Sequence, residues 1–195
     1  MNSASVVMLS RVRRAGASDG EPMLRRPLLA APFVLLVLAL SFAELSGGRA
    51  VVAATTSAVL VLLSAIDIER RIIPNRIVLP AAAIVLVEQL VLFPDQAGEW
   101  LLAPLIAAAI FFLPQLLGRA WMGMGDVKLM LLLGVALGWG VLGAALLAFV
   151  LVLPVSLILF ARQGMAARKT MIPFGPFLAA GGIVVLIGPA MAGLS

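Results

Sequence analysis

Residues 142–160 read LGAALLAFVLVLPVSLILF and carry no charged side chain. A helix of about 20 predominantly apolar residues crosses the core of a bilayer, so this stretch is long enough to span a membrane. Six other apolar windows of this kind lie at 28–45, 50–66, 76–93, 100–117, 127–139 and 174–193. The sequence therefore predicts an all-α fold, a polytopic transmembrane helix bundle with about six to seven spans.

The composition of the whole chain agrees with a membrane protein. Of the 195 residues, 63% are hydrophobic and 12% are charged, and the mean hydropathy is +1.18. Soluble domains carry about 45–50% apolar and about 25% charged residues. The chain contains no Cys and no His, which excludes disulfides, thiolate zinc sites and any mechanism that needs an imidazole. Acid–base chemistry must come from the carboxylates and the basic side chains.

The basic residues predict the orientation of the bundle. If the N-terminus is cytoplasmic, every Lys and Arg except Arg49 falls on the inner side, as the positive-inside rule requires. We therefore expect an N-in, C-out, multi-pass protein of the inner (plasma) membrane, with the lipid bilayer as its surroundings. The basic residues are divided among several loops without aromatic platforms between them, so no nucleic-acid partner is expected.

The first residues differ in composition from the rest of the chain. Residues 1–27 are polar and rich in Arg, and we expect them to form a cytoplasmic, disordered basic tail. The remainder, 28–195, would be one transmembrane domain. A competing interpretation is a cleaved signal peptide, because Ser41-Phe42-Ala43 resembles a small-residue cleavage site after an apolar run. The length of that run favours a retained span.

Two aspartates fall at the same predicted membrane face. Asp67 follows the end of the second span. Asp126 immediately precedes the fifth span and lies within the motif Gly-Met-Gly-Asp-Val-Lys. An acid at the edge of an apolar bundle is costly unless it is solvated, paired or used. Two neighbouring carboxylates share a proton, so one can take a proton from water while the other hydrogen-bonds a scissile carbonyl. The pair therefore suits peptide hydrolysis without a metal.

The position of each aspartate on its helix suggests a division of roles. Asp126 would open a helix, where the dipole favours negative charge, and Asp67 would close one, where it does not. We expect Asp126 to act as the base and Asp67 to carry the proton. This ordering requires the second helix to end soon after Asp67, and Pro74 is the first residue that must stop it. Gly123 and Gly125 would let a substrate backbone approach Asp126.

Each motif alone has an ordinary structural explanation. Asp126 could be an N-cap, and Asp67 could be an interfacial charge paired with a neighbouring arginine. Pro74-Asn75 is typical of a helix stop followed by an N-cap, and the segment 173–177 is typical of a turn with Pro opening a helix.

In this order and at this spacing, the motifs together resemble the type IV prepilin peptidase family, the polytopic aspartyl proteases of the GxGD class. The resemblance extends from about residue 50 to about residue 190. It implies cleavage of the basic leader of a Flp/Tad-like prepilin at the cytoplasmic membrane face, with Asp67 and Asp126 as the catalytic pair and no metal or cofactor. Residues near the substrate would be Gly123, Gly125, Lys128, Pro74, Asn75, Pro173, Gly175 and Pro176.

The absence of Cys separates this chain from the larger members of that family. Those enzymes carry Cys-Xaa-Xaa-Cys pairs associated with N-methylation of the product, so the chain resembles the short form that lacks the Cys-rich N-methyltransferase region. Two other interpretations remain open: a small proton- or cation-coupled transporter that uses the same acids, and an inactive membrane factor for pilus assembly. The sequence does not determine the oligomeric state.

Overall fold

The computed structural model describes residues 30–45, 47–117, 123–163 and 173–188. All regular secondary structure in these ranges is helical, which confirms the all-α class. Each of the seven apolar windows overlaps one α-helix. The helices are α2 (Ala31–Glu44), α3 (Gly47–Arg70), α4 (Asn75–Leu92), α5 (Ala97–Leu117), α6 (Met124–Leu137), α7 (Val141–Gln163) and α8 (Gly175–Ile187). The expected tail at 1–27 lies outside the described residues.

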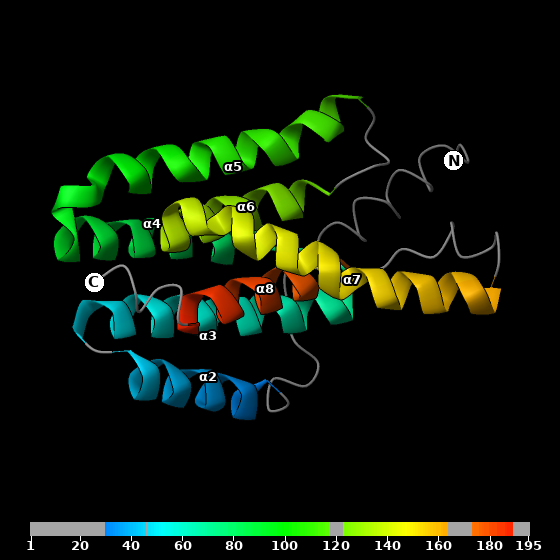
Figure 1. Cartoon of the computed structure of the whole chain (residues 1–195), viewed down its shortest axis with the longest axis horizontal. Helices are drawn as coiled ribbons and strands as arrows, with labels where there is room; N and C mark the ends of the chain where they lie inside the picture. Colours follow the sequence, from blue (N-terminus) through cyan, green and yellow to red (C-terminus); the bar gives the residue numbers. More distant parts are fainter. Residues whose placement is uncertain (1–29, 46, 118–122, 164–172, 189–195) are drawn as a thin grey trace, which may run out of the picture.

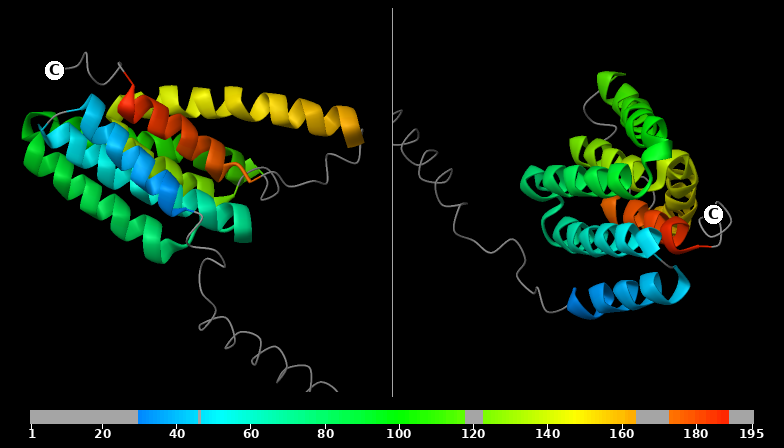
Figure 2. Two further views of the ribbon diagram at one scale, coloured as in Figure 1. Left: turned by 90° about the horizontal axis from the view of Figure 1, so that it is seen from below. Right: turned by 90° about the vertical axis from the view of Figure 1, so that its left-hand side faces the viewer.

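Successive helices run in opposite directions along the bundle (Figure 1). Two short 3-10 turns, η2 (Pro94–Gln96) and η3 (Gly138–Gly140), join α4 to α5 and α6 to α7. Helices α2 and α5 lie at opposite edges of the bundle (Figure 2). Because the direction alternates, the C-terminus of α3 and the N-termini of α4, α6 and α8 meet at one end of the molecule. The motifs selected from the sequence all lie at this end.

Four stretches of the described chain are long and apolar enough to cross a membrane. They are Gly47–Arg70, Asn75–Leu92, Pro94–Pro114 and Met124–Gln163, and the last contains both α6 and α7, which fold back on each other at η3. Helices α2 and α8 are apolar but shorter. Large apolar side chains are exposed on the outside of the bundle, as expected where a protein faces lipid.

Helix α6 forms the centre of the packed core. Leu132, Leu133 and Ala136 are fully buried, and α6 packs against α4, α5 and α8. A Cβ on Gly134 would lie 2.4 Å from the Cα of Pro104 in α5, so the two backbones approach as closely as only glycine permits. Small residues therefore determine how tightly the neighbours of α6 pack.

The end of α3 lies beyond the edge of its predicted window. The apolar window closes at residue 66, whereas the helix continues to Arg70 and ends at Arg71, which has a positive φ of 54°. Hydropathy marks the end of the apolar run, but backbone hydrogen bonds continue through the polar residues that follow it. Asp67 consequently lies in the last turn of α3.

Candidate active site

Asp67 is held inside the bundle although its side chain is a polar carboxyl group. Its side chain is only 7% exposed. The backbone N–H of Gly175, at the start of α8, donates a hydrogen bond to its carboxylate. The backbone carbonyl of Asp67 accepts the N–H of Arg71 at 2.8 Å, which closes the helix. The contact between α3 and α8 thus fixes the position of this acid.

Asp126 occupies the first turn of α6, three positions after the N-cap. The N-cap residue is Gly123, so the alternative in which Asp126 itself is the N-cap is wrong. Its carboxylate instead reaches back and accepts the backbone N–H of Gly123, as the acidic residue of a capping box does. The side chain is half-buried. The two carboxyl groups are close enough to interact electrostatically.

Two glycines near the pair leave little room for a side chain. A Cβ on Gly175 would lie 2.6 Å from Oδ2 of Asp67, and a Cβ on Gly125 would lie 3.2 Å from the Cβ of Ile73. The space beside Gly125 is therefore occupied by the segment that joins α3 to α4. Gly123 is exposed, and a Cβ there would meet only Oδ2 of Asp126, at 3.6 Å, and a backbone nitrogen. Of these glycines, Gly123 leaves the most open approach to a carboxylate.

Lys128 and Asn75 connect the starts of α6 and α4. The Nζ atom of Lys128 donates a short hydrogen bond to Oδ1 of Asn75. The N-cap of α4 is Pro74, so the expectation that Asn75 caps this helix is wrong. Pro74 takes the capping position because its extended backbone (ψ 127°) lies just outside the helix and its carbonyl accepts the first helical N–H groups. The Asn75 side chain is thereby left for Lys128.

The segment before α8 behaves as the sequence predicts. Pro176 lies in the first turn of α8, where its missing N–H costs nothing. Pro173 precedes the helix and is half-buried. The ring of Phe174 packs on that of Phe149 in α7, with centroids 5.3 Å apart. This packing positions the backbone of Gly175 at Asp67.

The arrangement combines two neighbouring carboxylates with one backbone donor for each. Such a pair can share a proton and act together as acid and base. Within the described residues, no group of three or more acidic side chains is arranged to hold a metal ion. The two carboxylates are thus the acid–base groups that the structure brings together at this end of the bundle.

Two contributors to the site were missed by sequence reasoning. One is the backbone N–H of Gly175, because the motif at 173–177 predicts a helix start but not its partner. The other is Ile73, which contacts Gly125 across a long sequence separation. For Ile73 the only signal was its position next to Pro74, whereas Gly175 itself was predicted as a residue near the substrate and only its partner was missed.

Comparison with known proteins identifies the family. Residues 54–161 match the model of the type IV leader peptidase family. Curated relatives named prepilin leader peptidase/N-methyltransferase are 31% identical over 181 residues in Pseudomonas putida and 30% identical over 171 residues in Aeromonas hydrophila. These alignments cover 90% and 84% of this chain, and 63% and 58% of the relatives. No solved structure gives a significant match.

The chain belongs to the type IV leader peptidase family. It spans less than two thirds of the length of these curated relatives. The family model includes both Asp67 and Asp126 and ends before the segment that carries Gly175.

Proposed function

We propose that this protein is a membrane-embedded aspartic endopeptidase that removes the basic leader of a type IV prepilin of the Flp/Tad-like kind. The observation that carries the proposal is the pairing of Asp67 and Asp126 at one end of an apolar bundle. Transport acids lie near the middle of the membrane, whereas these two lie where α3 ends and α6 begins. We propose the peptidase activity alone, because the chain contains no Cys.

In the proposed mechanism, Asp126 takes a proton from water while protonated Asp67 donates a hydrogen bond to the scissile carbonyl. The water oxygen attacks the carbonyl carbon and forms a tetrahedral intermediate, whose oxygen takes the proton from Asp67. The proton held by Asp126 then passes to the leaving amine as the C–N bond breaks. Proton return from the intermediate to Asp67 restores the carbonyl and the starting pair.

The helix ends support this assignment of roles. Asp126 lies in the first turn of α6, where backbone N–H groups point toward it, and Asp67 lies in the last turn of α3, among carbonyls. Because the two groups titrate as a coupled pair, the assignment is testable by following each carboxyl in isotope-edited infrared spectra. Ionisation of Asp67 before Asp126 would contradict it.

The activity is tested by co-expressing the chain with a candidate prepilin and following leader removal. We expect Asp67→Asn and Asp126→Asn each to abolish cleavage, and the double variant to be no worse than either, because the two groups act as a unit. Asp95→Asn is the matched control, since this acid lies in η2 at the other end of the bundle. Cleavage by either single variant would contradict the assignment of Asp67 and Asp126 as the catalytic pair.

We propose that the site faces the cytoplasm, since nearly all basic residues lie on that side in the N-in topology. The absence of Cys allows single reporters: Asp95→Cys and Gln163→Cys would place one thiol at each end of the bundle. A membrane-impermeant maleimide applied to intact spheroplasts should label residue 95 alone. Labelling of residue 163 alone would reverse the orientation.

A further inference from the structure

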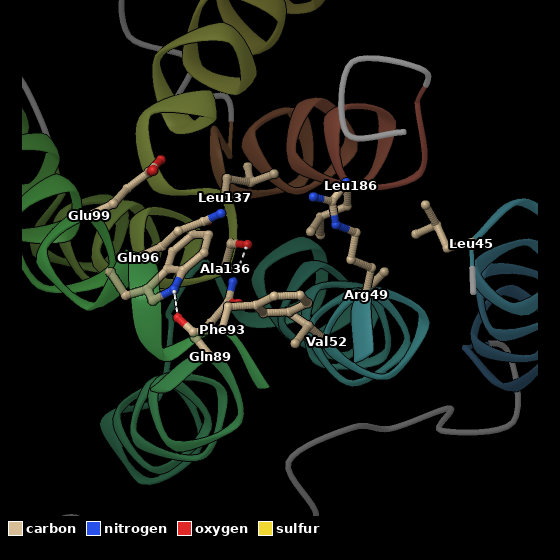
Figure 3. A pocket seen from close by; sticks show the side chains of 12 residues that line it. Leu45, Arg49, Val52, Gln89, Phe93, Gln96, Glu99, Ala136, Leu137 and Leu186 are labelled. Carbon is tan, nitrogen blue, oxygen red and sulfur yellow. Dashed lines mark hydrogen bonds between the residues drawn. The ribbon is translucent and has the colours of Figure 1, made fainter. Parts of the chain in front are cut away.

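A pocket lies at the end of the bundle opposite the two aspartates. It has a volume of about 240 Å³. Its walls come from α3, α4, η2, α5, α6 and α8, together with Leu45, the residue that follows α2. Most of its lining is apolar or aromatic, but four side chains are charged or amide: Arg49, Gln89, Gln96 and Glu99 (Figure 3). Ionisable residues inside a membrane-spanning bundle are rare and usually mark a functional site.

Gln89 supplies an unpaired acceptor. Its side chain is 2% exposed, and its Nε2 donates to the carbonyls of Val135 and Ala136 at 3.3 and 2.9 Å. Only the amide nitrogen can donate, so these two bonds fix which way the amide points. Its Oε1 is buried and has no hydrogen-bond partner. A buried acceptor without a donor costs free energy, and a ligand N–H group would relieve this cost.

Glu99 supplies negative charge at one side of the pocket. Its Oε1 accepts the backbone N–H of Trp139 at 2.9 Å and lies against Gly138. This contact anchors the carboxylate at the turn between α6 and α7. The acid is therefore placed by the fold and is not a mobile surface group.

Arg49 supplies positive charge on the other side. In Figure 3 its guanidinium and the Glu99 carboxylate lie on opposite sides of the pocket, with Ala136 and Leu137 between them. A guanidinium pairs well with phosphate oxygens. A pocket with separated base and acid suits a ligand that carries an anion at one end and a cation at the other.

We propose that this pocket binds a phosphoethanolamine headgroup. Arg49 would pair with the phosphate, and the ammonium N–H groups would reach the Glu99 carboxylate and Oε1 of Gln89. The volume is below the roughly 300–1,000 Å³ of pockets for drug-sized ligands, so it fits a headgroup rather than a whole lipid. The end of a membrane-spanning bundle lies at headgroup depth, where acyl chains could continue along the apolar outside.

The test is lipid retention by the purified full-length chain, measured by native mass spectrometry from micelles doped with one phospholipid. Phosphatidylethanolamine, phosphatidylcholine and phosphatidylglycerol with identical acyl chains are compared. We expect phosphatidylethanolamine to be retained about tenfold more than the others, because choline has no N–H and glycerol has no cation. Equal retention of the three lipids by the wild-type chain would overturn the proposal without any variant.

A soluble competitor distinguishes the source of the headgroup. Displacement of the lipid by glycerophosphoethanolamine would show that the headgroup alone is bound, and retention in its presence would show that the lipid form is bound. Both results require the ethanolamine preference and support the same chemistry.

Variants locate the binding to the pocket. Glu99→Gln keeps an oxygen for the Trp139 N–H but loses the charge, so the preference for ethanolamine over choline should fall about tenfold. Arg49→Gln should lower the retention of phosphatidylethanolamine and of phosphatidylcholine to the same degree. Asp95→Asn is the control, because this exposed acid lies near the same end but does not line the pocket. Loss of the preference in Asp95→Asn to the same degree would contradict a defined site.

Discussion

The backbone N–H of Gly175 donates a hydrogen bond to the carboxylate of Asp67, which joins the start of α8 to the end of α3. A Cβ on residue 175 would lie 2.6 Å from Oδ2 of Asp67. A side chain at residue 175 would therefore force the Asp67 carboxylate to shift. This contact orients the most buried carboxylate at the candidate site.

We predict that Gly175→Ala lowers leader cleavage about 100-fold, because the added methyl group displaces the Asp67 carboxylate and misplacement by about 1 Å has an effect of this size. The measurement is the initial rate of leader removal in detergent at saturating substrate. Gly143→Ala on α7 is the matched control, since a Cβ there meets nothing within 4 Å. Equal cleavage rates for the two alanine variants would show that Gly175 does not position the Asp67 carboxylate.

The hydrogen bond between Lys128 and Asn75 leads to a second prediction. Because it connects the starts of α6 and α4, Lys128→Met and Asn75→Ala should each reduce cleavage, and the double variant should match the more damaged single. A double-mutant cycle on cleavage rates should give a coupling of about 0.5–1 kcal/mol for this partly exposed pair. Additive effects would mean that the two residues act separately.

The juxtaposition of the aspartates follows from the sequence because the helices alternate in direction. Seven apolar windows require that the second span ends, and the fifth span begins, at the same face, and the structure has this arrangement. Asp67 and Asp126 could therefore be paired from the sequence alone, although they are far apart in the chain. Only the periodic alternation of spans was needed.

The contacts of single side chains could not be predicted in the same way. Nothing in the local sequence indicates that Asn75 accepts from Lys128 and does not cap α4, or that Ile73 packs on Gly125. Both depend on how closely α4 approaches α6, which tertiary packing determines. Gln89 is similar: an amide within a span is visible in the sequence, but its unpaired oxygen is not.

We predict that metal chelators leave cleavage unchanged. The proposed chemistry activates water with two carboxylates, and the described residues hold no cluster of three acids suited to a metal. The measurement compares initial rates after dialysis against EDTA or 1,10-phenanthroline with the rate in untreated protein. A loss of activity restored by one divalent cation would contradict the metal-free mechanism.

The contact between α5 and α6 gives a prediction about stability. A Cβ on Gly134 would lie 2.4 Å from the Cα of Pro104, and backbone atoms cannot move aside as a side-chain tip can. Gly134→Ala should therefore lower the free energy of unfolding by about 1–3 kcal/mol, the cost typical of overpacking. Far-ultraviolet circular dichroism during unfolding in SDS measures this loss, with Gly143→Ala as the unstrained control. Because α6 carries Asp126 at its start, we also expect cleavage to fall at temperatures where the variant is still folded. A variant as stable and as active as the control would show that α5 and α6 can separate without disturbing the site.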